Sequence, residues 1–155
     1  MKKTGAFAAL KIVHTVMLAG QVLFIGILFF MGFSKKIAPA LPGMDKLFQI
    51  IAVLLSAAGF LLGTTIFKKK LLAIRDDMNA NGVQEKFAKY RMACIMQWAM
   101  IEGPCLFCCI CFFLVGNYAF LALAAVLVLL FGMLAPVKIK AALQLGLSIS
   151  DMEEL

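Results

Sequence analysis

The chain has 155 residues, of which 64% are apolar and only 15% are charged. Soluble domains of this size are about 45–50% apolar and about 25% charged, so too little polar surface is available to cover a water-soluble globule. The composition therefore excludes a soluble enzyme, a disordered chain, a secreted disulfide scaffold and a nucleic-acid-binding domain. The formal net charge is +7, and its meaning depends on where the charges lie along the chain.

Four apolar stretches are each long enough for a transmembrane helix, which needs about 20 residues. They cover residues 12–33, 47–67, 92–115 and 118–137. The sequence therefore predicts an all-α protein with four transmembrane helices in one membrane domain, 1–155. The basic start of the chain raises the alternative of a cleaved signal peptide. We expect an uncleaved helix, because the first stretch is longer than the apolar core of a signal peptide and is followed by a poor cleavage site.

The basic residues are distributed unevenly. Twelve of the 15 Lys and Arg residues lie before the first stretch or at its start, in residues 68–91, or after residue 137, and three lie in the loop between the first two stretches. Basic residues favour the cytoplasmic side of a membrane, so both termini and residues 68–91 are predicted to be cytoplasmic. We expect a multi-pass protein of the cell inner membrane, whose excess positive charge attracts anionic lipid headgroups and requires no nucleic acid.

Residues 12–67 and 92–137 resemble each other when they are aligned as two helical hairpins. Gly20 then falls on Gly103, and Gly59 falls on Gly132. The alignment favours a duplicated hairpin with both copies in the same orientation. The alternative is that two unrelated hairpins share only their membrane composition.

The segments outside the four stretches also carry helical patterns. Residues 68–91 are predicted to be a cytoplasmic helical connection that extends the second and third helices, with a turn at 79–82. Pro136 is expected to bend the chain after the fourth stretch. Residues 138–155 form a predicted amphipathic tail, in which a stripe that includes Ile139 and Leu143 lies on the membrane surface.

Glu102 is the only acidic residue inside any of the four stretches. A charge in the middle of the bilayer costs about 2.5–3.5 kcal/mol on insertion scales. The Gly103-Pro104 pair follows it directly, and Pro104 deprives the carbonyl of Met100 of its helical donor, so we expect a helix break or bend there. Glu102 is either a functional site or a protonated side chain that joins two helices by hydrogen bonding.

Three polar residues are candidate partners of Glu102 in an ion-binding or interhelical hydrogen-bond site. Gln21 lies at a matching depth in the first stretch and gives the preferred pair, whereas His14 and Gln97 are alternatives. His14 is expected to be a satisfied polar residue near the membrane surface, with a proton relay as the alternative interpretation.

Five cysteines lie in the third stretch, and two of them form a CxxC pair, Cys105 and Cys108. A soft metal or redox site would need ligands that converge from several elements. We expect instead that these small polarizable residues line a helix contact, and we predict no metal and no cofactor. Gly59 and Gly63 give the second stretch a small-xxx-small face, which predicts a helix-packing seam.

Residues 85–107 resemble the second helix of the rotary ATP synthase proteolipid, the c subunit. The matching positions are Glu85, Lys89, Arg91, Ala99 and Glu102. The resemblance implies that Glu102 is a proton- or sodium-carrying acid, with Gln21 or Gln97 as co-ligand. It covers only this segment, and the chain as a whole resembles small four-span bacterial membrane proteins.

Two functions follow from these observations. The first is a non-catalytic accessory or scaffold subunit of a membrane complex, whose partners are the lipid bilayer and other membrane subunits or further copies of the chain. The alternative is a proteolipid-like protein or small transporter that moves protons or cations through Glu102. We do not expect an enzyme, because no nucleophile–base pair or metal set is evident in the sequence.

Overall fold

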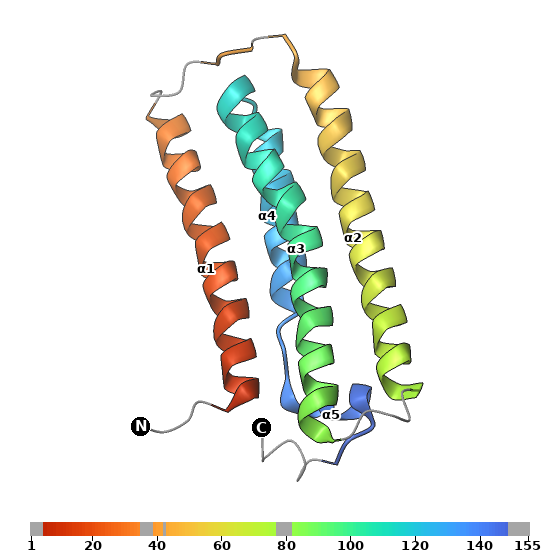
Figure 1. The fold of residues 1–155 in the computed structure, drawn as a ribbon. Helices are drawn as coiled ribbons and strands as arrows, with labels where there is room; N and C mark the ends of the chain where they lie inside the picture. Colours follow the sequence, from red (N-terminus) through yellow and green to blue (C-terminus); the bar gives the residue numbers. More distant parts are fainter. Residues whose placement is uncertain (1–4, 35–38, 42, 77–81, 149–155) are drawn as a thin grey trace.

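The computed structural model describes residues 5–34, 39–41, 43–76 and 82–148. All the regular secondary structure in these residues is helical, which confirms the predicted all-α class (Figure 1). The helices in chain order are α1 (Ala6–Phe33), α2 (Asp45–Asp76), α3 (Val83–Val115), α4 (Ala119–Met133) and α5 (Lys138–Leu145).

Three of these helices, α1, α2 and α3, are each long and apolar enough to cross a membrane. They contain 28, 32 and 33 residues. At about 1.5 Å per residue each exceeds the roughly 30 Å of the hydrocarbon core. The chain is therefore built as a small integral membrane protein.

The predicted fourth span, 118–137, is not one straight helix. α4 has 15 residues and is about 22 Å long, shorter than the hydrocarbon core. α5 then leaves at an angle of 70° to α4. Pro136 explains the break, because it lacks a backbone N–H and disfavours helical geometry in the residue before it. The pair makes a fourth span only if α4 and α5 are one broken crossing.

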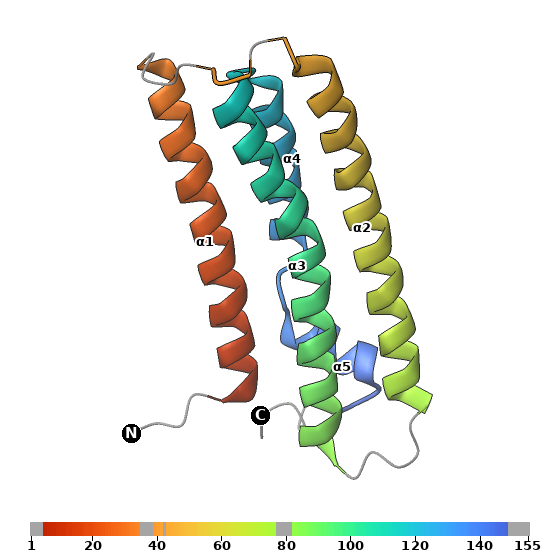
Figure 2. The same cartoon turned by 45° about the horizontal axis from the view of Figure 1, so that its top comes forward.

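The helices are arranged around α3. In Figures 1 and 2, α1 and α2 flank α3 on opposite sides and α4 lies behind it. α2 and α4 have the largest contacts with α3, whereas α1 packs more lightly on α3 and α4. A duplicated pair of hairpins would be expected to pack α1 on α2 as it packs α3 on α4. The halves differ in this respect, so the internal repeat stays a prediction from the sequence.

α1 joins the bundle through one narrow stripe. Its buried residues are Phe7, Leu10, His14, Gln21 and Leu28, whose spacing places them on a single helix face. Most of the remaining side chains of α1 are exposed. Lipid is as apolar as these side chains, so van der Waals packing and hydrogen bonds, rather than exclusion of water, hold such a helix in place.

The core is centred on the side of α3 that meets α4. Trp98 and Phe112 from α3 and Phe120 and Phe131 from α4 are each at most 1% exposed. Bulky rings of this kind make many dispersion contacts at close packing. The core therefore fixes α3 against α4 more firmly than it fixes α1.

Both helices next to the predicted connection extend beyond their apolar stretches. α2 continues to Asp76 and α3 begins at Val83, which confirms the helical extensions predicted within 68–91. The predicted turn at 79–82 lies outside the described residues except for Gly82. Gly82 itself has a φ of +127°, which a glycine adopts without strain.

The short helix predicted after Pro136 is present as α5. Ala141, Ala142 and Leu145 are buried, and α5 contacts α2 and α3. Ile139 and Leu143 are exposed, and their place on the membrane surface stays a prediction. α5 therefore packs beneath the helices by its small-residue face, and the rest of the tail, 149–155, lies outside the described residues.

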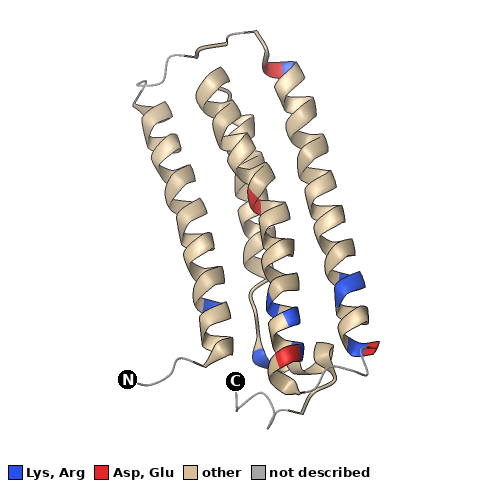
Figure 3. Cartoon of the chain, viewed as in Figure 1, with Lys and Arg blue, Asp and Glu red and all other residues tan. Residues whose placement is uncertain are grey.

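Charged residues gather near the ends of the helices. Figure 3 shows most of the described Lys and Arg positions at the end where α1 and α3 begin and α2 ends. The one acidic position in the middle of a helix is on α3 (Figure 3). The clustering is what a membrane topology with that end in the cytoplasm would require, and the orientation itself stays a prediction.

Candidate functional site

Glu102 lies in the middle of α3, between the buried Ile101 and the exposed Gly103. Its side chain is partly exposed, and it makes no hydrogen bond or ion pair with any described residue. The expected break at Gly103 and Pro104 does not interrupt the helix, because α3 is continuous from Val83 to Val115. Glu102 therefore carries a carboxyl group without a hydrogen-bond partner among the described residues, on the side of a continuous helix.

Gln21, the preferred partner, is buried on α1 and is 3% exposed. Neither the amide nitrogen nor the amide oxygen of Gln21 has a hydrogen-bond partner among the described residues. The ring of His14 lies 4.9 Å from that of Trp98, so these two residues lie at similar depths. Gln21 lies two turns beyond His14, and Glu102 lies one turn beyond Trp98. Gln21 and Glu102 therefore differ in depth by about 5 Å, which is within about one helical turn, but no hydrogen bond joins them.

The reason lies in the faces that the two residues occupy. Gln21 belongs to the buried stripe of α1 together with His14, which packs on α3 and α4. Glu102 lies at the edge of α3, next to a residue that faces outward. An unpaired buried amide costs about 1–3 kcal/mol of folding stability, so Gln21 destabilises the folded protein in this arrangement.

His14 occupies a structural position between three helices. Its Nε2 lies 3.1 Å from the carbonyl oxygen of Phe131, and its ring stacks on that of Phe131 at a centroid distance of 4.8 Å. Phe131 lies in the last turn of α4, and its carbonyl also accepts a hydrogen bond from the Leu134 N–H at 3.0 Å. As the Nε2–H tautomer, His14 donates to this carbonyl and joins α1 to the end of α4.

Gln97 faces a small polar cavity at the bend between α4 and α5. The cavity has a volume of about 20 Å³, enough for one water molecule. Its polar lining residues are Tyr90, Gln97, Lys140 and Gln144. The Tyr90 hydroxyl donates to Oε1 of Gln144 at 3.0 Å, which joins α3 to α5. Glu102 is not part of this lining.

The four polar candidates are therefore separated rather than brought together. His14 holds the end of α4, Gln97 faces the small cavity, Gln21 is enclosed without a partner, and Glu102 lies near the outer surface. Within the described residues, no group of three or more His, Cys, Asp or Glu side chains is placed to hold a metal ion.

Gly59 and Gly63 lie where α2 meets α3. A methyl group on Gly59 would overlap the carbonyl oxygen of Met100 and would lie 2.8 Å from Cγ of Pro104. A methyl group on Gly63 would lie 3.1 Å from Cβ of Met100. The Met100 carbonyl is the one that Pro104 leaves without its helical donor. The two glycines thus allow α2 to lie very close to α3 at Pro104, which is two residues after Glu102 in the sequence.

All five cysteines are buried and reduced on α3. The thiol of Cys105 points to the carbonyl of Ala124 on α4 at 3.8 Å, a weak hydrogen bond between two packed helices. This placement agrees with cysteines that line a helix contact.

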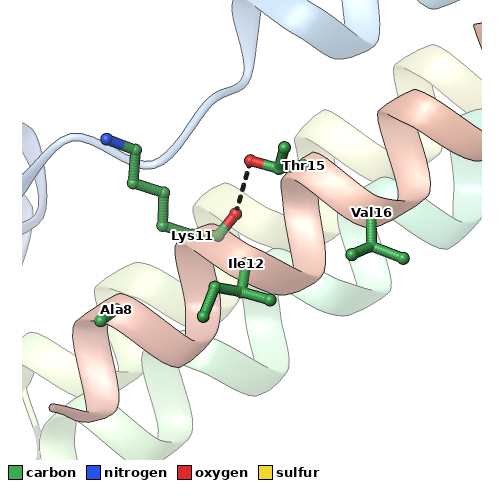
Figure 4. Close-up of a pocket in the computed structure, with 5 residues that line it drawn as sticks. All are labelled: Ala8, Lys11, Ile12, Thr15 and Val16. Atoms are coloured by element: carbon green, nitrogen blue, oxygen red, sulfur yellow. Dashed lines mark hydrogen bonds between the residues drawn. The ribbon is translucent and has the colours of Figure 1, made fainter. Parts of the chain in front are cut away.

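The surface of α1 carries a shallow hollow of about 330 Å³. Figure 4 shows the residues that line it, which all come from this one helix: Ala8, Lys11, Ile12, Thr15 and Val16. The hydroxyl of Thr15 donates to the carbonyl of Lys11 at 2.9 Å and is therefore satisfied locally. The hollow is a gap between neighbouring side chains, with no convergent polar groups.

Comparison of the chain with protein-family models, curated proteins and solved structures finds no match. The likeness of residues 85–107 to the proteolipid c subunit stays a resemblance of one segment. In that segment, Lys89 and Glu85 form an ion pair at 2.8 Å, one helical turn apart on an exposed surface.

Sequence reasoning missed two features of this region. One is the ring contact of His14 with Trp98 and Phe131, and the other is the polar cavity beside α5. The break at Pro136 accounts for the second, because it turns α5 back beneath α3. The proline was visible in the sequence, but the residues that the turned chain brings together were not.

Proposed function

We propose that this protein is a non-catalytic accessory or scaffold subunit of a complex in the cell inner membrane. Glu102 is the single observation that carries the proposal. It is a partly exposed acid in the middle of a membrane-length helix, with no hydrogen-bond partner among the described residues. Lipid tails offer no donor at this depth, whereas a helix of another subunit can provide one.

The remaining surface supports the same proposal. α1 is held by one stripe of buried residues, and large apolar side chains such as Val16, Leu23 and Phe30 are more than 60% exposed. A bundle of this kind has ample surface for contacts with neighbouring membrane helices. Both termini are proposed to lie in the cytoplasm on the basis of the charge distribution.

Translocation of protons or cations through Glu102 is the second candidate. Gln21 favours it, because both amide atoms are buried without a partner among the described residues, within about one helical turn of the depth of Glu102. An amide oxygen and a carboxylate are suitable ligands for a hard cation. For this function α1 must turn so that Gln21 reaches Glu102.

Two measurements on the full-length chain distinguish the candidates. Native mass determination after extraction in mild detergent should give a mass above that of one chain, together with other subunits. Reconstituted vesicles should show no proton or sodium flux, and Glu102→Gln should insert and assemble normally. A lone chain whose vesicles conduct ions, with flux abolished by Glu102→Gln, would replace the accessory role with translocation.

A further inference from the structure

One face of α3 is left uncovered along most of the membrane-length part of the helix. Its exposed residues recur at alternating steps of three and four: Met96, Ala99, Gly103, Leu106, Ile110 and Phe113. We call this set the outer seam. Steps of three and four are the spacing of the a and d positions in paired helices. The seam is about 26 Å long at 1.5 Å per residue, close to the thickness of the hydrocarbon core.

The centre of the outer seam is built from small residues. Ala99 and Gly103 are both exposed and lie one turn apart. A methyl group on Gly103 would meet no atom within 4 Å. Small residues at this spacing let a second membrane helix approach closely. By contrast, the glycine pair on α2 is already covered by α3.

Glu102 lies immediately beside this centre. If Gly103 is an a position and Leu106 a d position, Glu102 is a g position, which faces the e positions of the opposite helix. In a parallel second copy of this chain, the e positions are Met100 and Phe107, which offer no hydrogen-bond donor. A second copy would therefore leave the carboxyl group of Glu102 unpaired.

We propose that the outer seam docks a transmembrane helix of a different subunit, which carries a basic or amide side chain in its middle to pair with Glu102. This inference rests on the proposed accessory role and names the surface and the partner chemistry. The small residues bring the two helices close together, and the donor from the partner satisfies the carboxyl group. The pair then removes the cost of an isolated acid in the bilayer.

The test uses the full-length chain and a synthetic transmembrane peptide of leucine and alanine with one lysine at its centre. A twin peptide carries leucine in place of that lysine. Association is measured by energy transfer in phosphatidylcholine vesicles. We expect the lysine peptide to bind the chain about tenfold more tightly than its twin, as one interhelical polar contact of 1–2 kcal/mol would give.

Variants locate the binding surface. Glu102→Leu and Gly103→Leu should each weaken binding of the lysine peptide about tenfold, whereas Glu102→Gln should retain most of it. The matched control is Gly26→Leu on α1, because a side chain at Gly26 also meets open space. Circular dichroism checks that each variant keeps its helices, and the open surroundings of Gly103 predict that its variant folds.

Several results would overturn the inference. They are equal binding of the two peptides, no binding at all, and an equal loss of binding with Gly26→Leu. Self-association of the labelled chain that Gly103→Leu abolishes would show that a second copy covers the seam. If the peptide fails while the native chain remains in a larger complex, this inference fails and the accessory role stands. A native chain that runs alone contradicts the accessory role whatever the peptide does.

Discussion

The contact between Gly59 and α3 predicts that Gly59→Ala, which adds only one methyl group, lowers the stability of the protein. In Gly59→Ala the added methyl group would overlap the Met100 carbonyl oxygen and lie 2.8 Å from Cγ of Pro104. The carbonyl belongs to the backbone of a continuous helix, and the proline ring is rigid, so neither can move aside cheaply. α2 must shift away from α3, which costs about 1–3 kcal/mol by analogy with overpacked cores.

A control variant separates the effect of this contact from the effect of adding a methyl group to a helix. Gly26→Ala adds the same methyl group to an exposed position of α1 where nothing lies within 4 Å. Alanine is the better helix former by about 0.5–1 kcal/mol, so the control should leave the stability unchanged or raise it. The free energy of unfolding of Gly59→Ala should therefore be lower than that of Gly26→Ala by more than 1 kcal/mol.

Trp98 provides the assay, because it is the only tryptophan in the chain and is 1% exposed in the core. Its fluorescence should report unfolding when mild-detergent micelles are titrated with dodecyl sulfate. If Gly59→Ala unfolds at the same dodecyl sulfate fraction as Gly26→Ala, α2 does not pack on the proline of α3 as described. Gly63→Ala should give an intermediate result, because its nearest contacts, 3.1 Å to Cβ of Met100 and 3.3 Å to the Gln97 carbonyl oxygen, are less severe than the overlap at Gly59.

Two further substitutions test the contacts made by the end of α4 and by α5. His14→Phe keeps a ring to stack on Phe131 but removes the donor to the Phe131 carbonyl. The free energy of unfolding should therefore fall by about 1 kcal/mol in the same fluorescence titration. An unchanged midpoint would argue against this hydrogen bond. Tyr90→Phe removes the donor to Gln144 and should cost a similar amount, with amide exchange in α5 accelerated. Tyr118→Phe, at a half-exposed position, is its control and should leave both measurements unchanged.

The long helices could be predicted from the sequence because hydropathy alone specifies them. The predicted ends at residues 33 and 115 coincide with the ends of α1 and α3. The fourth span stays a prediction, because α4 and α5 make one crossing only as a helix pair bent by 70°. Composition counts the apolar residues of 118–137 but does not show how far the helix continues before the bend at Pro136.

The candidate site was predictable in its members but not in its geometry. In a soluble helix, the apolar stripe reveals which face is buried. In a membrane helix every face is apolar, so nothing in the sequence distinguishes the buried Gln21 from the partly exposed Glu102. The glycine pair on α2 was predictable, because small residues at a spacing of four have a steric meaning independent of hydropathy.

Gln21 separates the two candidate functions most directly. In the accessory role its amide group serves no purpose, so Gln21→Met, which keeps the length of the side chain, removes an unpaired buried amide. Stability should then rise by about 1–3 kcal/mol, and native assembly should be unaffected.

In the translocation role Gln21 must swing toward Glu102, and that motion requires α1 to release the bond between His14 and the Phe131 carbonyl. Gln21→Met would then abolish flux, and His14→Phe would increase it by freeing α1. If the chain translocates ions, the two variants therefore change the vesicle flux in opposite directions. In the accessory role only the dodecyl sulfate titration changes, with a higher stability for Gln21→Met and a lower one for His14→Phe. A stabilised Gln21→Met with intact assembly fits a subunit whose only functional polar group is the one that faces outward on α3.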